Sequence, residues 1–506
     1  MNPLLPDDMM DQHKSPIDID ASLFREAGHQ VIDDIADFLS SISSYPLTNA
    51  PTSKLLQEKL PKKMPSAGTD PLTLLKETWQ LLVENSLFNG HPRFWGYITS
   101  SPAPIGMLGD LLASSLNSNC GAFVLSPMAT EIEKQTIQWL AELIGYPAGD
   151  GIMVSGGNMA NFVGFLAARK TKANWDIRKF GLQPSQGKWR IYTSSETHTW
   201  VNKAADLFGL GLEAIQWIPV DANQKMNVSF LEERIIKDKN EGLIPLIVVG
   251  TAGSVGTGAV DPLDEIAAIC KKHDCWFHID GAYGGFAAAL PELKELFHGI
   301  ELADSIAIDP HKWLYSPLEA GCILMKDSNA LTDAFSFHPA YYNFEGEGEP
   351  QTNFYERGFQ NSRGFRALKV WLCFRQVGAE GHIQMIRKDV QLSKRLFKLL
   401  NEYEEIETFT QNLSIITFRY KPAEIDAGKE QEYLNQLNQS LLNRLQTSGE
   451  LFPSNTVLDG NFLLRTCIVN FRTGFSDIKL LPVILLREGK LIHEQMQKQR
   501  SVVSGS

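Results

Sequence analysis

The sequence predicts an α/β protein in which a largely parallel mixed sheet carries helices on both faces and is followed by a smaller C-terminal α+β unit. Two observations predict this class. Through the middle of the chain, short apolar segments alternate with segments long enough for a helix, which is typical of strand–helix–strand units. Beyond about residue 395 this alternation gives way to shorter helix and strand pieces. With 506 residues, the chain is long enough for more than one structural unit.

The first predicted element is an amphipathic helix from Ser22 to about Ile42. Apolar residues recur there at helical spacing, namely Leu23, Ala27, Val31, Ile35 and Leu39. Such a stripe packs on another surface, either a helix of the same chain or a second subunit, and the sequence leaves both open. We therefore predict an N-terminal helical segment over residues 1–85, a large unit over 86–395 and a small unit with a polar tail over 396–506.

Short apolar segments predict the strands of the large unit. They cover residues 151–155, 190–194, 214–220, 245–250, 275–280, 305–309 and 321–325. Most are separated by helix-length segments such as Asn158–Lys170 and Asp264–His273. Ligands bind such sheets at the carboxyl ends of the strands, where we expect Ser155, His278, Asp280 and Lys312.

Composition limits the classes of partner and compartment. The formal net charge of −12 argues against nucleic acid or an anionic membrane surface as the main partner. No apolar run approaches the roughly 20 residues of a membrane-spanning helix, and the N-terminus lacks the pattern of a signal peptide. The six cysteines fall in apparent core elements, as expected in a reducing compartment. We therefore expect a cytoplasmic protein.

Two predicted strands each bring a charged side chain to their carboxyl end. Asp280 ends the strand 275–280, and Lys312 follows the strand 305–309 in a Pro-His-Lys-Trp turn. Apolar surroundings favour the neutral, nucleophilic form of a lysine amine. Pyridoxal phosphate requires such an amine and an anion that faces its pyridinium nitrogen. The Ser155-Gly-Gly-Asn158 segment offers backbone amides to a phosphate at a helix start, although alone it indicates no more than a turn.

These segments also carry a resemblance to a known family. His278-Ile-Asp-Gly-Ala-Tyr-Gly-Gly285 and Asp309-Pro-His-Lys-Trp313 resemble the pyridoxal-phosphate-dependent amino-acid decarboxylases of the aromatic-amino-acid and glutamate type. The similarity covers roughly residues 20 to 480. Further motifs follow in family order: Phe24–Gly28, Val31–Phe38, His91–Tyr97, Ser155–Asn158, Thr251–Ser254, Thr257–Pro262 and Ser362–Trp371. The resemblance implies a fold-type-I enzyme, a small-molecule amino-acid substrate and a homodimer with the site at the subunit interface. It also implies that the N-terminal helical segment, residues 1–85, packs on the partner subunit.

The resemblance also implies roles for individual residues. Lys312 is expected to hold the cofactor through an imine, and Asp280 to keep its ring nitrogen protonated. His198 is expected to stack on the ring. Tyr341 is the expected donor of a proton to the α-carbon after carbon dioxide leaves, with Tyr342 as the alternative. The remaining cofactor contacts are expected from Gly157, Asn158, Ala282 and His311.

Several alternatives stay open. His278, Asp280 and His311 match the ligand types of a two-histidine, one-carboxylate iron site, but that interpretation leaves Lys312 and the glycine turn unexplained. Aldehyde synthases of the same family also oxidise the amine, and a catalytically inactive binding protein is a third class. For Arg363 and Arg366, structural ion pairing is as well supported as a functional role.

The segment His91-Pro-Arg-Phe-Trp-Gly-Tyr-Ile98 lies where the substrate pocket of the resembling family begins. Trp95, Tyr97 and Ile98 would offer flat, apolar surface, which favours an aromatic L-amino acid. Aromatic residues at such positions are more often plain core. A substrate with a side-chain carboxylate would lose solvation there unless an arginine supplied a partner, so an acidic amino acid is the alternative.

Overall fold

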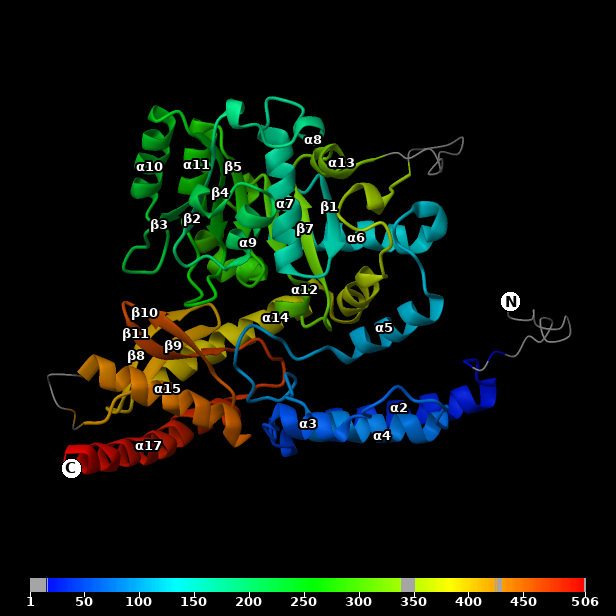
Figure 1. Cartoon of the computed structure of the whole chain (residues 1–506), viewed down its shortest axis with the longest axis vertical. Helices are drawn as coiled ribbons and strands as arrows, with labels where there is room; N and C mark the ends of the chain where they lie inside the picture. Colours follow the sequence, from blue (N-terminus) through cyan, green and yellow to red (C-terminus); the bar gives the residue numbers. More distant parts are fainter. Residues whose placement is uncertain (1–14, 16, 338–350, 424, 426–429, 505–506) are drawn as a thin grey trace, which may run out of the picture.

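The protein contains two β-sheets, one large and mostly parallel, the other small and antiparallel (Figure 1). The computed structural model describes residues 15, 17–337, 351–423, 425 and 430–504. In the figure, the large sheet occupies the upper part and the small sheet lies below it on the left. This arrangement agrees with the predicted class.

The large sheet has seven strands in the order β1-β7-β6-β5-β4-β2-β3. These are β1 (Asp150–Val154), β2 (Trp189–Ser194), β3 (Ile215–Ile218), β4 (Ile244–Thr251), β5 (Trp276–Asp280), β6 (Ser305–Ile308) and β7 (Gly321–Met325). The pairs among β3, β2, β4, β5 and β6 are parallel, whereas β7 runs antiparallel to both β6 and β1. Every residue of β1, β5, β6 and β7 is buried, as expected for strands covered on both faces.

Helices cover both faces of this sheet (Figure 1). They are α6 (Pro127–Ile144), α7 (Gly157–Lys172), α8 (Ile177–Phe180), α9 (Trp200–Leu207), α10 (Val228–Asn240), α11 (Leu263–His273), α12 (Pro310–Trp313) and α13 (Ala330–Phe335). In α11, acids occupy the first turn and bases the last, which complements the helix dipole.

The N-terminal helices lie along the lower side of the molecule in Figure 1. They are α2 (Ala21–Ser41), α3 (Ser53–Lys59) and α4 (Pro71–Asn85), followed by α5 (Pro104–Leu116). Asp20 caps α2 by accepting hydrogen bonds from two backbone amides of the first turn. In this chain α2 contacts α4, where Phe38, a residue outside the predicted stripe, meets Trp79 edge to face at 5.8 Å between ring centroids.

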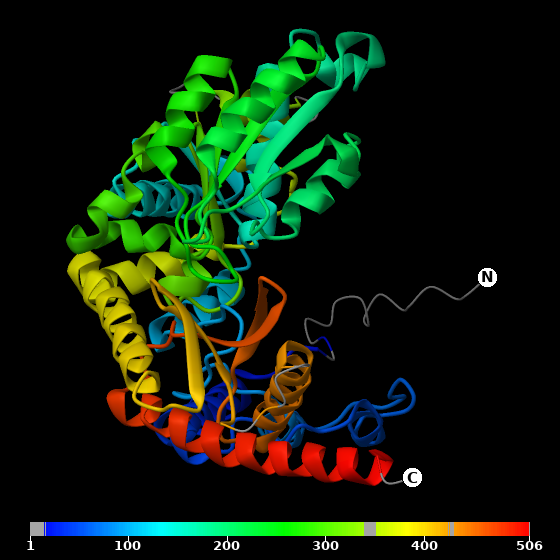
Figure 2. The same ribbon diagram turned by 90° about the vertical axis from the view of Figure 1, so that its left-hand side faces the viewer.

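The small unit is built on a four-stranded antiparallel sheet in the order β10-β11-β9-β8. Its strands are β8 (Ile406–Asn412), β9 (Ile415–Tyr420), β10 (Ser454–Leu458) and β11 (Asn461–Cys467). Its helices are α15 (Glu430–Ser448), α16 (Phe475–Ile478) and α17 (Leu480–Ser504), and α17 lies along the lower edge of the molecule in Figure 2. The long α14 (Arg366–Leu400), with non-helical geometry at Gly378, contacts α5 and α6 as well as β8. The predicted boundary at 395/396 thus falls inside a helix that joins the two units.

Across the described residues, no helix combines the length and apolar character needed to cross a bilayer.

Candidate active site

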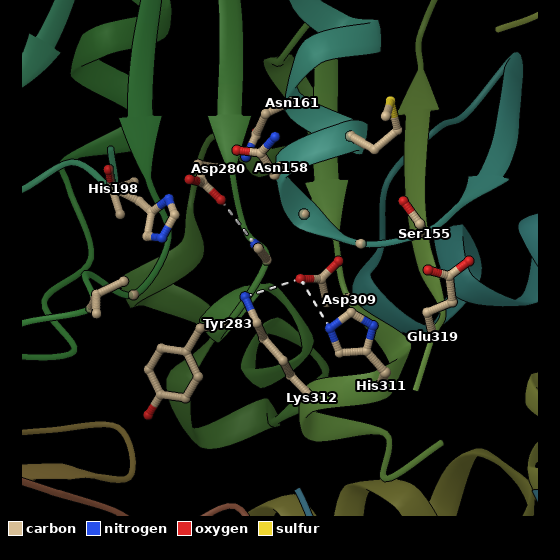
Figure 3. Close-up of a pocket in the computed structure, with 17 residues that line it drawn as sticks. Ser155, Asn158, Asn161, His198, Asp280, Tyr283, Asp309, His311, Lys312 and Glu319 are labelled. Atoms are coloured by element: carbon tan, nitrogen blue, oxygen red, sulfur yellow. Dashed lines mark hydrogen bonds and ion pairs between the residues drawn. The ribbon is translucent and has the colours of Figure 1, made fainter. Parts of the chain in front are cut away.

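A cavity of about 360 Å³ opens at the carboxyl ends of β1, β4, β5 and β6 (Figure 3). Thr251 and Asp280 close their strands, and Asp309 follows β6 directly. The start of α7 forms the opposite wall. The cavity is lined by Ser155, Gly156, Gly157, Asn158, Met159, Asn161, His198, Thr251, Gly253, Val255, Asp280, Ala282, Tyr283, Asp309, His311, Lys312 and Glu319. The fold therefore brings all of the predicted cofactor contacts to one place.

Lys312 projects into this cavity from α12, a single turn that begins at Pro310 (Figure 3). Its Nζ lies 3.0 Å from Asp309 Oδ2, one helical turn back. The next residue, Trp313, is fully buried, stacks on Tyr283 at 5.0 Å and donates from Nε1 to Asp389 at 3.1 Å. This packing fixes the turn that carries Lys312, while the amine at the end of the lysine side chain stays accessible from the cavity.

The Asp280 carboxylate is oriented by two hydrogen bonds. Trp200 Nε1 donates to Oδ2 at 2.8 Å, and the backbone amide of Ala282 donates to Oδ1 at 3.2 Å. The side chain is 7% exposed. Figure 3 shows it on the side of the cavity away from the Lys312 turn. A fixed carboxylate at this depth suits a cationic ring nitrogen.

His198 lies beyond Asp280, on the loop after β2 (Figure 3). Its Nδ1 accepts a hydrogen bond from the Trp200 amide at 3.3 Å. Loss of solvation lowers the pKa of His198; Asp280 opposes this shift and Lys312 adds to it. The ring is therefore neutral near pH 7 and presents an uncharged aromatic face to the cavity.

The glycine turn before α7 approaches the Lys312 turn closely. A Cβ added to Gly157 would lie 2.7 Å from Asp309 Oδ2 and 2.8 Å from the Ala282 methyl carbon, and one on Gly156 would lie 3.0 Å from the His311 ring. Such contacts are too short for a side chain, so glycine is required here. The result is a hollow at the amino end of a 16-residue helix, where backbone amides attract an anion.

Asp309 and Glu319 also line the cavity, although no site role was predicted for either of them from the sequence. Asp309 had a detectable signal, since it ends a strand and stands three residues before the lysine on the same turn. The sequence contains no comparable signal for Glu319, because a loop brings this residue to the cavity. There its carboxylate pairs with Arg366 at 2.8 Å. The role of Arg363 is also structural: its guanidinium is buried against the Glu133 carboxylate.

His278 faces the core instead of the cavity. Its Nδ1 shares a hydrogen bond of 2.7 Å with Ser305, and its Nε2 shares one of 2.7 Å with Asn161. Burial lowers its pKa to about 3, so it stays neutral. With both ring nitrogens engaged, it is not available beside Asp280 and His311. The described parts of the chain contain no group of three or more side chains able to hold a metal ion.

The predicted substrate residues do not line this cavity. Trp95 is fully buried in the core of the small unit, with Nε1 donating to Thr473 at 3.3 Å. Tyr97 is 59% exposed, and Ile98 is half-buried against the core of the large unit. Tyr341 and Tyr342 lie outside the described residues, so their proposed role in proton transfer stays a prediction.

The residues present fit pyridoxal phosphate. The cofactor needs an amine, an anion for the ring nitrogen and a phosphate site. Lys312, Asp280 and the hollow at the start of α7 meet these three needs within one cavity. Lys312 lines the cavity, and the glycines at 156 and 157 leave the phosphate site open.

Comparison with known proteins agrees with this chemistry. Residues 53–421 match the family model described as the pyridoxal-dependent decarboxylase conserved domain. The chain is 33% identical to an aromatic-L-amino-acid decarboxylase from Bacillus atrophaeus over 91% of this chain and 94% of that one. It is 28% identical to a phenylacetaldehyde synthase from a Rosa hybrid cultivar, over 89% of this chain and 90% of that one.

The fold agrees as well. The crystal structure of Oryza sativa TDC with PLP and tryptamine superposes with a TM-score of 0.87 at 26% identity, covering 95% of this chain and 99% of that one. Matches of this extent cover both units and the cavity between the strand ends and α7. The chain therefore belongs to the family of pyridoxal-phosphate-dependent amino-acid decarboxylases.

Proposed function

We propose that this protein removes the carboxyl group of an aromatic L-amino acid, releasing carbon dioxide and the corresponding amine. The observation that carries the choice of substrate is a second cavity of about 370 Å³ next to the first, with His311 in the wall of both. Its lining is largely apolar, including Phe38, Leu39, Phe88, Pro102, Met107 and Leu318. An aromatic side chain suits such a space.

Each residue of the site would have a separate role in the reaction. When bound, pyridoxal phosphate supplies the conjugated ring that accepts the electrons left by carbon dioxide. Lys312 would hold its aldehyde, and Asp280 would keep a proton on its ring nitrogen. His198 supplies a neutral aromatic face on the cavity wall. Tyr341 is our candidate for returning a proton to the α-carbon.

The segment that follows Tyr97 contributes to the wall of the second cavity. Thr99 and Ser100 line the second cavity, and Ser100 Oγ donates to the His311 carbonyl at 2.8 Å. The predicted segment thus joins the substrate cavity to the Lys312 turn through residues just beyond Ile98. Trp95 is core, and neither Tyr97 nor Ile98 is among the residues that line the two cavities, so their contact with substrate stays a prediction.

Arg472 supports a second candidate, an acidic amino acid. This residue also lines the second cavity, where it donates to Ser101 Oγ and lies over the Phe471 ring at 4.5 Å. Loss of solvation lowers its pKa, and it forms no ion pair with any described acidic residue. A half-buried guanidinium without a carboxylate partner is the group that a second substrate acid would need.

Specificity constants decide between the two candidates. We expect tyrosine, tryptophan or dopa to be turned over more efficiently than glutamate or aspartate, by tenfold or more. In Arg472→Met, aromatic turnover should persist, and Arg472→Lys serves as the matched control that keeps a charge. A preference for glutamate or aspartate that disappears in Arg472→Met would contradict the aromatic assignment while leaving decarboxylation in place.

The aldehyde synthases in the family are the other chemical outcome. Measuring amine, aldehyde and hydrogen peroxide in the same reaction separates the two. We expect amine equal to carbon dioxide and no peroxide, because His198 and Tyr341 are both retained. Peroxide and aldehyde from the unmodified protein would identify a synthase instead.

We also propose a homodimer in the cytoplasm. The α5 helix exposes Leu108, Leu111, Leu112 and Leu116 at 45–70% of their surface, and the nearby loop exposes Val124 and Leu125, each at 54%. Such apolar patches are typical of subunit interfaces. All six cysteines are buried and unpaired, which suits a reducing compartment.

A further inference from the structure

Strand β1 leads directly into the glycine turn that forms the phosphate hollow, and it lies at the edge of the large sheet. It pairs with β7 on one side, and all five of its residues are buried. Along the outer side of an edge strand, backbone amides and carbonyls are left without a strand to pair with. In a buried strand these groups need other partners, because a buried polar group without a hydrogen bond is costly.

Two charged side chains supply these partners at Met153. The Met153 amide donates to Glu133 Oε1 at 3.0 Å, and Arg363 Nη2 donates to the Met153 carbonyl at 2.7 Å. The two side chains also pair with each other: Arg363 Nη2 lies 2.5 Å from Glu133 Oε1, and Nη1 lies 3.1 Å from Oε2. Both are buried, with 1% of the Arg363 side chain and 0% of the Glu133 side chain exposed. This ion pair therefore takes the place of a neighbouring strand at Met153.

The glycine turn follows Met153 closely in the chain. Ser155, Gly156 and Gly157 come within the next four residues, and all three line the cavity. The turn is also confined by β7, where a Cβ on Gly321 would lie 2.5 Å from Gly156 Cα. Because groups that bind a ligand must be held to within about 0.5 Å, the position of β1 decides whether the amides of this turn face a phosphate correctly.

The Arg363 guanidinium is itself held in one orientation. Its Nη1 donates to the Cys120 carbonyl at 2.9 Å, and its Cζ lies 4.9 Å from the centroid of the Phe354 ring. The Arg363 carbonyl accepts a hydrogen bond from the Cys120 amide at 2.8 Å. A planar guanidinium makes several such contacts at once, whereas a lysine ammonium offers a single compact charge. Arg363 is therefore suited to hold one carboxylate and two backbone carbonyls in a fixed arrangement.

The amino end of β1 carries a second ion pair of the same kind. The Gly151 amide donates to Asp150 Oδ1 at 2.8 Å, and Arg357 Nη1 pairs with the same oxygen. The Asp150 side chain is 4% exposed, and the Arg357 side chain is 22% exposed. This pair anchors the same strand at the end that lies away from the cavity. It therefore separates a general effect on β1 from an effect on the glycine turn.

We propose that the Arg363–Glu133 ion pair positions the glycine turn for the cofactor phosphate by fixing both backbone groups of Met153. Neither side chain is among the residues that line the cavity, so both are positioning residues. Arg363 thereby takes part in cofactor binding although it lies 210 residues from Met153 in the sequence. The inference rests on the family's cofactor and goes beyond the choice of substrate.

Dissociation constants for pyridoxal phosphate and for pyridoxal, which lacks the phosphate, test the proposal. Their ratio measures how much the phosphate contributes to binding. In Arg363→Lys and Glu133→Asp, which keep the charges but alter their reach, we expect the preference for the phosphorylated form to fall by about tenfold or more. Affinity for pyridoxal should change by less than about threefold. Arg357→Lys, the same substitution at the other end of β1, should leave the ratio unchanged.

Hydrogen exchange in the cofactor-free wild type gives a second readout, which does not depend on a variant that folds. A peptide spanning Met153 to Gly157 should already be protected before loading, because the ion pair holds the turn in place. Rapid exchange there that slows only on loading would overturn the proposal. So would an unchanged ratio in either variant that folds, or an equal fall in Arg357→Lys. None of these measurements requires turnover, so a failure here is distinguishable from a failure of the proposed function.

Discussion

Single side chains at the ends of strands carry the chemistry of this protein. Asp280 ends β5, and Lys312 lies on the turn α12 that follows the neighbouring strand β6. A tryptophan fixes each of them: Trp200 donates to Asp280, and Trp313, the residue after Lys312, stacks on Tyr283. Buried indoles exclude water and hold these groups in one orientation. The two charged groups are therefore positioned before any ligand arrives.

Replacing Asp280 by asparagine should reduce turnover far more than cofactor binding. The amide cannot keep a proton on the ring nitrogen, while the phosphate hollow and Lys312 are unchanged. We expect kcat to fall by about a hundredfold or more, as for other pre-organised electrostatic groups, with cofactor affinity altered much less. Glu319→Gln should keep near-normal kcat. Equal losses in the two variants would refute the role of Asp280.

At the scale of elements, the sequence predicts the strands well because buried parallel strands are short apolar runs ending in polar residues. The predicted strand 321–325 matches β7, and the predicted helix from Ser22 to Ile42 begins and ends within one residue of α2. Sequence does not indicate that β7 runs antiparallel to both neighbours, since direction depends on the path of the connecting chain. The prediction that Trp95 lines the substrate pocket is wrong, because Trp95 is buried in the core of the small unit. An apolar run in the sequence does not show which unit will bury it.

The turn into α7 gives a test at this scale. Gly157→Ala would place a methyl group 2.7 Å from Asp309 Oδ2, and overpacking of this kind costs about 1–3 kcal/mol. We expect affinity for pyridoxal phosphate to fall by about tenfold or more. Gly28→Ala, in α2, meets nothing within 4 Å and should leave affinity unchanged. Normal cofactor affinity in Gly157→Ala would show that the phosphate lies elsewhere.

The contact between α14 and the Lys312 turn depends on a buried acid. Asp389 on α14 accepts hydrogen bonds from Tyr315 at 2.6 Å and Trp313 at 3.1 Å through the same oxygen. Burial raises the pKa of Asp389 to about 7, although both hydrogen bonds act in the opposite direction. The folded state therefore binds one more proton than the unfolded state between about pH 4 and 7.

It follows that the free energy of unfolding falls through this group as pH rises from 4 to 7, by at most about 1.4 kcal/mol per pH unit. Above about pH 7 the Asp389 carboxyl is ionised in both the folded and the unfolded state, so its contribution to the free energy of unfolding no longer changes with pH. Thermal unfolding midpoints at pH 5, 6, 7 and 8 should fall more steeply for the wild type than for Asp389→Asn. Parallel profiles would show that Asp389 does not titrate in this range.

At the scale of the whole molecule, the site lies where the two units meet. Tyr283, in the cavity wall, exchanges hydrogen bonds with Ser414 in the turn between β8 and β9. The N-terminal helices complete the second cavity through Phe38 and Leu39. Residues from all three segments of the chain therefore surround the proposed substrate, and sequence periodicity alone does not predict such a junction.

The exposed leucines of α5 give the prediction at this scale. Leu112, which is 55% exposed, should be buried in a homodimer. Leu112→Glu is expected to convert dimers to monomers in light scattering and to reduce activity. Leu212→Glu, at a position 57% exposed on the far end of the large sheet, is the control and should remain dimeric. A monomeric wild type with full activity would contradict the proposed assembly.

Carbon dioxide release from carboxyl-labelled L-amino acids tests the central claim most directly, with wild type and Lys312→Ala compared in the presence of pyridoxal phosphate. We predict that the wild type releases label from at least one aromatic amino acid, with an equal amount of amine. Lys312→Ala should keep the fold but lose the visible absorbance of covalently held cofactor, and its release of label should fall by several orders of magnitude. Comparable release by both proteins, or none by the wild type from any aromatic or acidic amino acid, would contradict the account.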